Sequence, residues 1–312
     1  MFPASTAPHL IHRPIRVDLV NLWHESTLEA KESNALIALL RTRFDLRISE
    51  DPEVLFYSRF REHQNLHRTY DCLKFFVTSE CDRPRPQQAD LSLSFDPDSP
   101  VNVRVPNWRF NAHTLQTIFT PFDVEAEAAS KTDFCNFVYS NGQAKRRIRF
   151  FHQLSRYKPV RSGGRFMNNV GGAVADKCAF QQTHKFSIAF ENQSYPGYST
   201  EKIVDAFAAR TVPIYFGDPE ITRDFNPKSF INGHDFKSLQ ALADYVREVD
   251  QNDALYHQYL AAPAFNDGLA RIAAIDARLF SAFKNLIENP PVPRASQSLR
   301  NRLLRRFEKW KA

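Results

Sequence analysis

Lys202 is the residue whose type and position most clearly suggest chemistry. It follows Glu201 at the start of an expected helix, within the segment GYSTEKI, Gly197–Ile203. The exposed N–H groups and the dipole of a helix start favour anions, so the dipole does not favour a lysine there. A bound anion would give this lysine a function. The alternative is an ordinary Glu-Lys pair on the surface of an amphipathic helix.

Two short apolar runs flank this lysine in the sequence. Phe186–Phe190 and Val212–Phe216 suit buried parallel strands, and the polar segment Glu191–Ser199 between them suits a loop. Thr200 can cap the intervening helix. Strand, helix and strand in this order predict a βαβ unit with a right-handed crossover. Such a unit places Lys202 at the carboxyl end of the sheet, where open α/β folds bind ligands.

The same alternation of strands and helices runs along the whole chain and predicts an α/β fold in two domains. Further strands are expected at Ile15–Leu22, Glu53–Tyr57, Leu73–Ser79 and Asp90–Phe95, and further helices at Thr27–Arg43, Ser238–Glu248 and Gly268–Glu288. The predicted parts are an N-terminal acceptor-binding domain (1–128), a C-terminal donor-binding domain (129–288) and a basic tail (289–312). Asp123–Lys131 is expected to be the linker.

The segment around Lys202 resembles the donor-binding signature of the α1,3/4-fucosyltransferases, glycosyltransferase family 10, in their bacterial form. The matching runs, in this order, are FEN (Phe190–Asn192), GYSTEKI (Gly197–Ile203), VPIYFGDP (Val212–Pro219) and DFNPKSFIN (Asp224–Asn232). The segment Asp133–Leu154 resembles the family more weakly. Further upstream only the order of elements and a few short runs agree.

The resemblance implies a fold and an activity. The fold would be two Rossmann-like domains facing across a cleft, the glycosyltransferase-B arrangement. The activity would transfer L-fucose from GDP-fucose, with inversion, to a hydroxyl of N-acetylglucosamine or glucose in a glycan acceptor, expected at O3. Two alternatives stay open. The chain could use another nucleotide sugar, or it could be a catalytically inactive protein that binds a nucleotide or a glycan.

The resemblance also implies residues that bind the donor. The positions that match residues holding the ribose and neighbouring parts of the donor are Asn192, Tyr198 and Glu201. Lys202 matches the lysine that binds the diphosphate, and Arg147 aligns with an arginine that grips the phosphates, with Arg146 and Arg149 as alternatives. Cations at these positions stabilise the charge that grows on the departing nucleotide. We therefore expect neither a metal nor another cofactor.

The general base is less well defined. In the family it is a glutamate of the N-terminal domain, and a carboxylate suits the deprotonation of a sugar hydroxyl. Glu80, after the run Leu73–Ser79, is one candidate. Asp98 and Asp96 are the others, since Pro97 stands where some bacterial members have a glutamate. A third alternative is that the base lies in neither of these two regions. The Asp-x-Asp pattern binds metals in other glycosyltransferases, but two carboxylates are too few to define a site.

The net charge of +6 comes from the C-terminal tail. Residues 294–312 contain seven Lys or Arg and one Glu, so 7 − 1 = +6, and the rest of the chain is balanced. Apolar residues form one stripe of this basic segment, which predicts an amphipathic helix on an anionic membrane surface. The alternative is a helix docked on the protein. Charge confined to a tail argues against nucleic-acid binding.

Two further features concern the cellular compartment. The N-terminal residues lack the apolar stretch of a signal peptide, and no run reaches the roughly 20 apolar residues of a spanning helix. We therefore expect a cytoplasmic protein that is peripheral on the membrane through its tail. The four cysteines show no Cys-x-x-Cys spacing and are expected to be free thiols.

Overall fold

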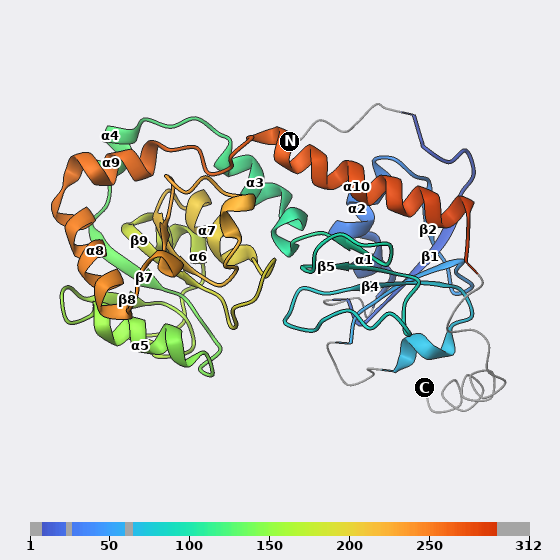
Figure 1. Cartoon of the computed structure of the whole chain (residues 1–312), viewed down its shortest axis with the longest axis horizontal. Helices are drawn as coiled ribbons and strands as arrows, with labels where there is room; N and C mark the ends of the chain where they lie inside the picture. Colours follow the sequence, from blue (N-terminus) through green and yellow to red (C-terminus); the bar gives the residue numbers. More distant parts are fainter. Residues whose placement is uncertain (1–7, 23–26, 60–64, 292–312) are drawn as a thin grey trace. The chain divides into compact units, whose positions relative to one another are not determined.

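Two parallel β-sheets organise the chain, each in its own structural unit (Figure 1). The computed structural model describes residues 8–22, 27–59 and 65–291. One unit consists of the described residues up to Phe110 and from Ile272 onward, and the other is Asn111–Arg271. The prediction of an α/β fold built on parallel strands is therefore confirmed.

The sheet of the first unit has the strand order β2-β1-β3-β4-β5-β6, with every neighbouring pair parallel. Its strands are β1 (Ile15–Val20), β2 (Leu46–Ile48), β3 (Val54–Tyr57), β4 (Leu73–Val77), β5 (Leu91–Ser94) and β6 (Asn102–Arg104). All four strands predicted here are present. Sequence reasoning missed β2 and β6, which have three residues each and form the two edges of the sheet.

The single helix predicted over Thr27–Arg43 is wrong. The chain forms α1 (Leu28–Glu32) and α2 (Ala35–Arg41) instead. Asn34 separates them, because its side-chain oxygen accepts the N–H groups of Leu36 and Ile37 and so begins a new helix. Apolar periodicity continues across the break, and the sequence pattern therefore hid it.

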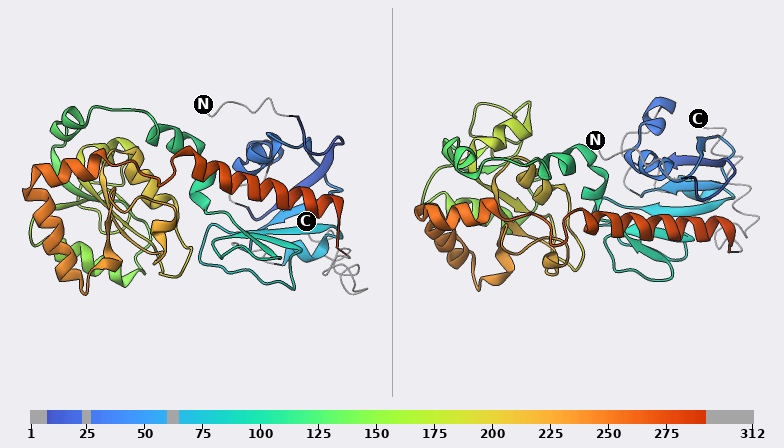
Figure 2. Two further views of the ribbon diagram at one scale, coloured as in Figure 1. Left: turned by 45° about the horizontal axis from the view of Figure 1, so that its top comes forward. Right: turned by 90° about the horizontal axis from the view of Figure 1, so that it is seen from above.

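A long C-terminal helix covers part of the first sheet. Helix α10 (Leu269–Glu288) runs beside these strands in both views of Figure 2. Its Phe283 ring lies 4.8 Å from Phe44, 6.0 Å from Phe56 and 5.4 Å from Phe75. Residues 272–288 belong by their contacts to the unit of the first sheet. The sequence-based division placed them in the domain 129–288, with the second sheet. The predicted functional boundaries stay predictions.

The sheet of the second unit has the order β11-β10-β9-β7-β8, and it is also parallel throughout. Its strands are β7 (Asp133–Phe137), β8 (Val160–Ser162), β9 (His184–Phe190), β10 (Val212–Phe216) and β11 (Ile231–Asn232). Helix α7 (Glu201–Ala208) connects β9 to β10, which confirms the predicted βαβ unit.

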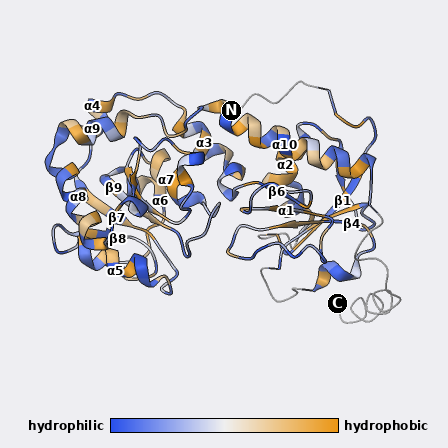
Figure 3. Cartoon of the chain, in the orientation of Figure 1, coloured by the Kyte–Doolittle hydropathy of each residue, from blue (hydrophilic) through white to orange (hydrophobic). Residues whose placement is uncertain are grey.

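The remaining helices of this unit surround its sheet. They are α3 (Ala112–Ile118), α4 (Val124–Ala129), α5 (Lys145–Leu154), α6 (Lys177–Gln182), α8 (Leu239–Gln251) and α9 (Asp253–Ala261). Short 3₁₀ turns occur at Leu66–Thr69 and Asn107–Phe110 in the first unit and at Ile221–Arg223 and Gly233–Asp235 in the second. In Figure 3 these helices carry both hydrophobic and hydrophilic residues, as expected for helices that cover a buried sheet.

Two sequence expectations bear on segments outside the sheets. The expected linker Asp123–Lys131 contains α4, because the Asp123 carboxylate accepts the N–H of Ala126 at 3.0 Å and caps a helix. The tail 294–312 lies outside the described residues. Among the helices of the described ranges, none combines the length and apolar character needed to cross a bilayer. The four cysteines are thiols and form no disulfide, as expected.

Candidate functional site

The carboxyl ends of β9 and β10 bring the candidate residues of the second unit together. Phe190 pairs with Phe216 in the sheet, and the next residue, Glu191, donates its N–H to the Phe216 carbonyl at 2.7 Å. The chain beyond β10 passes very close to Glu191. A Cβ on Gly217 would lie 2.3 Å from the Glu191 Cγ, so only glycine fits there.

Lys202 lies in a dense polar cluster in the first turn of α7. Its Nζ is 2.8 Å from Thr200 Oγ1, 3.1 Å from Glu191 Oε2 and 3.2 Å from Glu201 Oε1. The side chain is only 14% exposed. Burial by itself lowers the pKa of Lys202, but the negative charges of Glu191 and Glu201 outweigh it and raise that pKa. The ammonium therefore stays charged at every physiological pH.

Glu191 is the partner of Lys202 that sequence reasoning missed. Its side chain is fully buried. Its carboxylate accepts the backbone N–H of Thr200 at 2.7 Å and the Thr200 hydroxyl at 2.7 and 2.9 Å. Burial raises the pKa of Glu191, while Lys202 opposes that shift. An acidic residue in a polar loop gave no sequence signal for such burial.

Arg147, on α5, contacts Asn192, the residue that follows Glu191 in the chain. Its Nη2 donates to Asn192 Oδ1 at 2.7 Å, and its guanidinium lies 3.7 Å from the centre of the Tyr139 ring. The residue is 1% exposed. Within the described ranges Arg147 forms no ion pair, and its Nε has no hydrogen-bond partner. A buried guanidinium without a counter-ion is costly, and an anionic ligand would lower that cost.

The two alternatives to Arg147 lie differently. Arg146 is exposed and stacks on Phe216, with its guanidinium carbon 3.9 Å from the ring centre. Arg149 is also exposed. Only Arg147 of the three is buried and bonded to Asn192. Because Glu191 and Asn192 are neighbours in the chain, one short segment holds both Lys202 and Arg147.

Glu201 and Tyr198, the other expected donor-binding residues, also lie in this region. The Glu201 side chain is 41% exposed. Burial by itself raises the pKa of Glu201, but Lys202 and Lys177 lower it to about 2. Tyr198 is buried and stacks on Tyr195 at 4.8 Å between ring centres.

Lys177 at the start of α6 is a further cation that sequence reasoning missed. Its Nζ lies 2.6 Å from Asp205 Oδ2, one helical turn beyond Glu201 on α7. The spacing of four residues places Glu201 and Asp205 on the same side of the helix. Charges of alternating sign, from Glu191 through Lys202, Glu201 and Lys177 to Asp205, therefore follow the first turns of α7.

The candidate bases all lie in the first unit. Glu80 is in the turn after β4, where its N–H donates to Thr78 Oγ1 at 3.2 Å. Asp96 forms an ion pair with Arg83 at 3.0 Å, and its side chain is 20% exposed. Asp98 pairs with Arg278 at 3.1 Å, and its side chain is 49% exposed. These carboxylates belong to one unit and the cations described above to the other.

The residues do not fit a metal site. Asp96 and Asp98 pair with different arginines, so they do not converge on one point. Across the described ranges, no three His, Cys, Asp or Glu side chains are grouped so that they could hold a metal ion. That the protein needs no metal stays a prediction.

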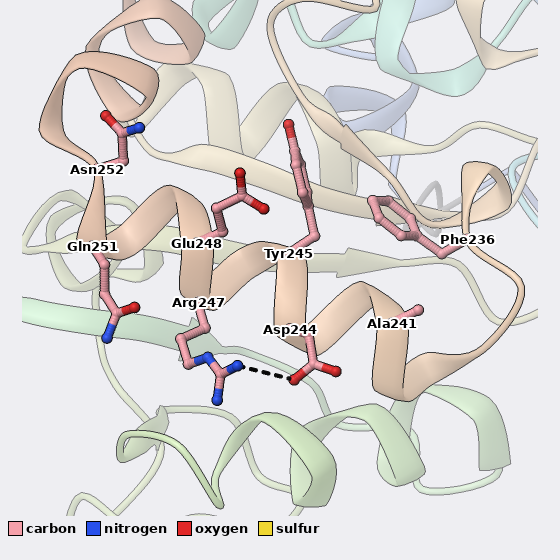
Figure 4. Close-up of a pocket in the computed structure, with 8 residues that line it drawn as sticks. All are labelled: Phe236, Ala241, Asp244, Tyr245, Arg247, Glu248, Gln251 and Asn252. Atoms are coloured by element: carbon pink, nitrogen blue, oxygen red, sulfur yellow. Dashed lines mark ion pairs between the residues drawn. The ribbon is translucent and has the colours of Figure 1, made fainter.

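A surface hollow of about 720 Å³ lies on α8 (Figure 4). Its lining consists of Phe236, Ala241, Asp244, Tyr245, Arg247, Glu248, Gln251 and Asn252. Asp244 and Arg247 form an ion pair across 3.7 Å. None of the candidate residues lines this hollow, and it therefore does not change the assignment of the site.

Two family models match the chain. The model "Glycosyltransferase family 10 (fucosyltransferase) C-term" matches residues 128–263, which include the whole cluster around Lys202. The model "Alpha-(1,3)-fucosyltransferase FucT N-terminal domain" matches residues 17–111. The matched segments together include both sheets.

Individual proteins agree with these models. The alpha-(1,3)-fucosyltransferase FucT of Helicobacter pylori is 26% identical over 89% of this chain and 67% of its own length. A rat 4-galactosyl-N-acetylglucosaminide 3-alpha-L-fucosyltransferase 9 is 32% identical over 54% of this chain, which spans 45% of that relative. A putative fucosyltransferase of a mimivirus is matched over only 24% of its length.

Solved structures match nearly the entire chain. A crystal structure of an alpha1,3-fucosyltransferase with GDP-fucose superposes with a TM-score of 0.76 at 25% sequence identity, covering 92% of this chain and 95% of that one. The corresponding structure with GDP also has a TM-score of 0.76, covering 94% of each chain. Both sheets therefore have counterparts in one solved chain.

Proposed function

Because the chain belongs to glycosyltransferase family 10, the fucosyltransferases, we propose that it is an α1,3-fucosyltransferase that uses GDP-fucose. The acceptor is a hydroxyl, expected at O3, of N-acetylglucosamine or glucose in a glycan. The two parallel sheets are the two Rossmann-like halves of a glycosyltransferase-B fold. The second sheet binds the donor and the first binds the acceptor.

The observation that carries this proposal is the pair of cations beside β9, of which Arg147 is buried and Lys202 is largely buried. Lys202 and Arg147 are each held by one residue of the adjacent pair Glu191 and Asn192. Fucosyl transfer breaks the bond between the sugar C1 and an oxygen of the β-phosphate, so negative charge grows on GDP. Two fixed cations stabilise this charge more in the transition state than in the ground state. Asn192, Tyr198 and Glu201 hold the ribose and neighbouring parts of the donor.

The acceptor hydroxyl supplies the attacking oxygen, and its proton passes to a carboxylate of the first unit. We assign this role to Glu80, with Asp98 and Asp96 as the alternatives. The oxygen attacks C1 from the face opposite the leaving GDP, and the configuration at C1 is therefore inverted. A carboxylate general base typically contributes about 10²–10⁴-fold in rate.

A donor and acceptor screen tests the proposed function. GDP-fucose would be compared with other GDP-, UDP- and CMP-sugars on acceptors that contain N-acetylglucosamine or glucose, and the products identified by mass and linkage. We expect transfer from GDP-fucose only, with an α1,3 linkage. Transfer from another donor would identify a different transferase. GDP binding without turnover on any acceptor would identify an inactive binding protein.

The basic tail is a separate proposal, which rests on sequence alone. Residues 294–312 would attach the enzyme to an anionic membrane surface, because each Lys or Arg near such a surface contributes about 1 kcal/mol. A chain ending after Asn289 should stay active but no longer sediment with anionic vesicles. High salt should weaken the binding of the full chain. Aggregation of the shortened chain, with no vesicle binding by the full one, would indicate a tail docked on the protein.

A further inference from the structure

Glu191 combines complete burial, a full set of bonding partners and direct contact with a proposed donor-binding cation. We propose that Glu191 is a positioning residue whose carboxylate fixes the Lys202 ammonium at the start of α7, ready for the diphosphate of GDP. This inference rests on the proposed function, and it adds a residue that does not itself touch the donor. It follows from three observations.

The first observation is that the Glu191 carboxylate is buried, although a carboxylate in a loop could remain in water. An isolated carboxylate is strongly destabilised by removal from water, so buried carboxylates are paired and hydrogen-bonded. Among the residues that the structure describes, Glu191 meets this condition only through those at the start of α7, namely Thr200 and Lys202. The buried carboxylate is therefore stabilised only when the start of α7 holds Thr200 and Lys202 against it.

The second observation is the use made of Thr200. This residue is the N-cap of α7, yet its side chain makes no capping hydrogen bond to the helix. Its hydroxyl instead donates to Glu191 and accepts from Lys202 Nζ. Capping by threonine would ordinarily stabilise a helix. Here the hydroxyl instead joins the carboxylate to the ammonium.

The third observation is the close fit around Glu191. Gly217 leaves no room for a side chain beside the Glu191 Cγ, and the Glu191 N–H is bonded to β10. The backbone at Glu191 is thus fixed against both β9 and β10. A lysine held by such a group has few orientations available, which reduces the cost of placing it against a phosphate.

Removal of the negative charge should change how Lys202 titrates. Without Glu191 the ammonium keeps its burial but loses its main attraction, so its pKa should fall. The titratable groups that interact with Lys202 or with its partner Glu201 are Glu191, Glu201, Tyr139, Asp205 and Lys177. Lys177 and Asp205 form their own pair, and Tyr139 is buried. Glu191 is therefore the residue whose replacement should expose the titration of Lys202.

A carboxylate that pairs with a lysine of β9 provides a matched control. Asp250 is a second buried carboxylate paired with lysines, at 2.6 Å from Lys158 and 3.0 Å from Lys185. Lys185 is near the start of β9, whereas Glu191 follows its end. Asp250→Asn therefore removes an equally buried charge from α8, beside the opposite end of β9. It should affect stability without affecting the GDP site.

The experiment is a titration of GDP binding to the full chain between pH 7 and 9.5, with guanosine as a second ligand. For Glu191→Gln we expect the ratio of its Kd to the wild-type Kd to rise about tenfold per unit above the lowered pKa of Lys202. This ratio cancels the titration of GDP itself. It should stay flat for guanosine, which lacks phosphates, and for Asp250→Asn. Glu191→Asp keeps the charge and should restore most of the wild-type profile.

A double-mutant comparison shows whether Glu191 acts through Lys202. In a Lys202→Met background, Glu191→Gln should have no further pH-dependent effect on GDP binding. An equal effect in that background, or a flat ratio for Glu191→Gln alone, would overturn the proposal. If Glu191→Gln does not fold, NMR titration of the lysine side chains in the unaltered protein gives the answer. Lys202 losing its proton at a lower pH than the other lysines would contradict the proposal.

The outcomes separate this inference from the proposed function. GDP binding with the expected pH pattern but without fucosyl transfer would leave Glu191 in its role and refute the proposed function. Fucosyl transfer together with a flat Kd ratio would do the reverse. No binding of GDP by the unaltered chain would refute both.

Discussion

The loops at the carboxyl ends of the two sheets hold charge in opposite ways. Beside the second sheet, Arg147 is buried and Lys202 is largely buried, and both are fixed by the residues that follow β9. Beside the first sheet, Asp96 and Asp98 are partly exposed and paired with arginines that are themselves 60% and 36% exposed. Exposed ion pairs are worth only about 0–1 kcal/mol and are easily exchanged. The comparison indicates a rigid donor site and acceptor-side carboxylates that can change partners.

The largest expected effect comes from removing the fixed cations. Lys202→Met and Arg147→Met should each lower kcat/KM with GDP-fucose by about 10²–10³-fold, because each deletes a charge that stabilises the leaving group. Methionine keeps much of the buried length, so the melting temperature shows whether the fold survives. Arg146→Met and Arg149→Met, at exposed positions of the same helix, should have far smaller effects. Near-normal kcat/KM in Lys202→Met or Arg147→Met would remove that residue from the site.

A change in the first unit should affect transfer but not donor binding. Glu80→Gln should reduce turnover by about 10²-fold or more, because a general base is lost, while the Kd for GDP stays unchanged. Asp98→Asn and Asp96→Asn serve as matched replacements. If Asp98→Asn is inactive and Glu80→Gln is active, the base is in the other loop. Full activity in all three would leave the proton without an acceptor among them.

The acid stability of the donor site tests the alternating charges on α7. The pKa of Glu201 is about 2 in the folded protein, below its ordinary value of 4.5. Because the folded value is the lower one, the stabilisation is complete above pH 4.5 and is lost as the pH falls toward 2. Glu201→Gln should therefore lower the melting temperature at pH 7, and the difference should shrink below pH 4.5. A constant difference from pH 7 to 2.5 would contradict this reasoning.

The smallest expected effect is that of metal removal. Activity should be unchanged in excess EDTA, because Lys202 and Arg147 supply the positive charge that a metal would otherwise provide. The measurement is the rate of transfer with EDTA and after addition of manganese or magnesium. Loss of activity that manganese restores would make Asp96 and Asp98 metal ligands after all. The carboxylates beside the first sheet would then bind a metal, and would no longer contrast with the cations beside the second sheet as groups held only by exchangeable ion pairs.

Local sequence patterns were sufficient for the central elements. The runs Phe186–Phe190 and Val212–Phe216 are buried strands in the structure, and α7 lies between them, because apolar periodicity and cap residues act over a few neighbours. Lys202 was identifiable for the same reason, since a cation in the first turn of a helix is unexpected. The edge strands β2 and β6 are too short to show such a pattern.

Tertiary structure decided which charges are buried and what they contact. Arg146, Arg147 and Arg149 lie within one turn of α5, and their types do not tell them apart; only the packing of α5 selects Arg147 for burial beside Asn192. Glu191 reads as a loop residue, and its burial depends on β10 and the start of α7 meeting at one point. Charge burial is set by segments distant in sequence, because desolvation and pairing depend on all neighbours in space. The sequence determined the elements and the first-turn lysine, and the fold determined the partners that hold it.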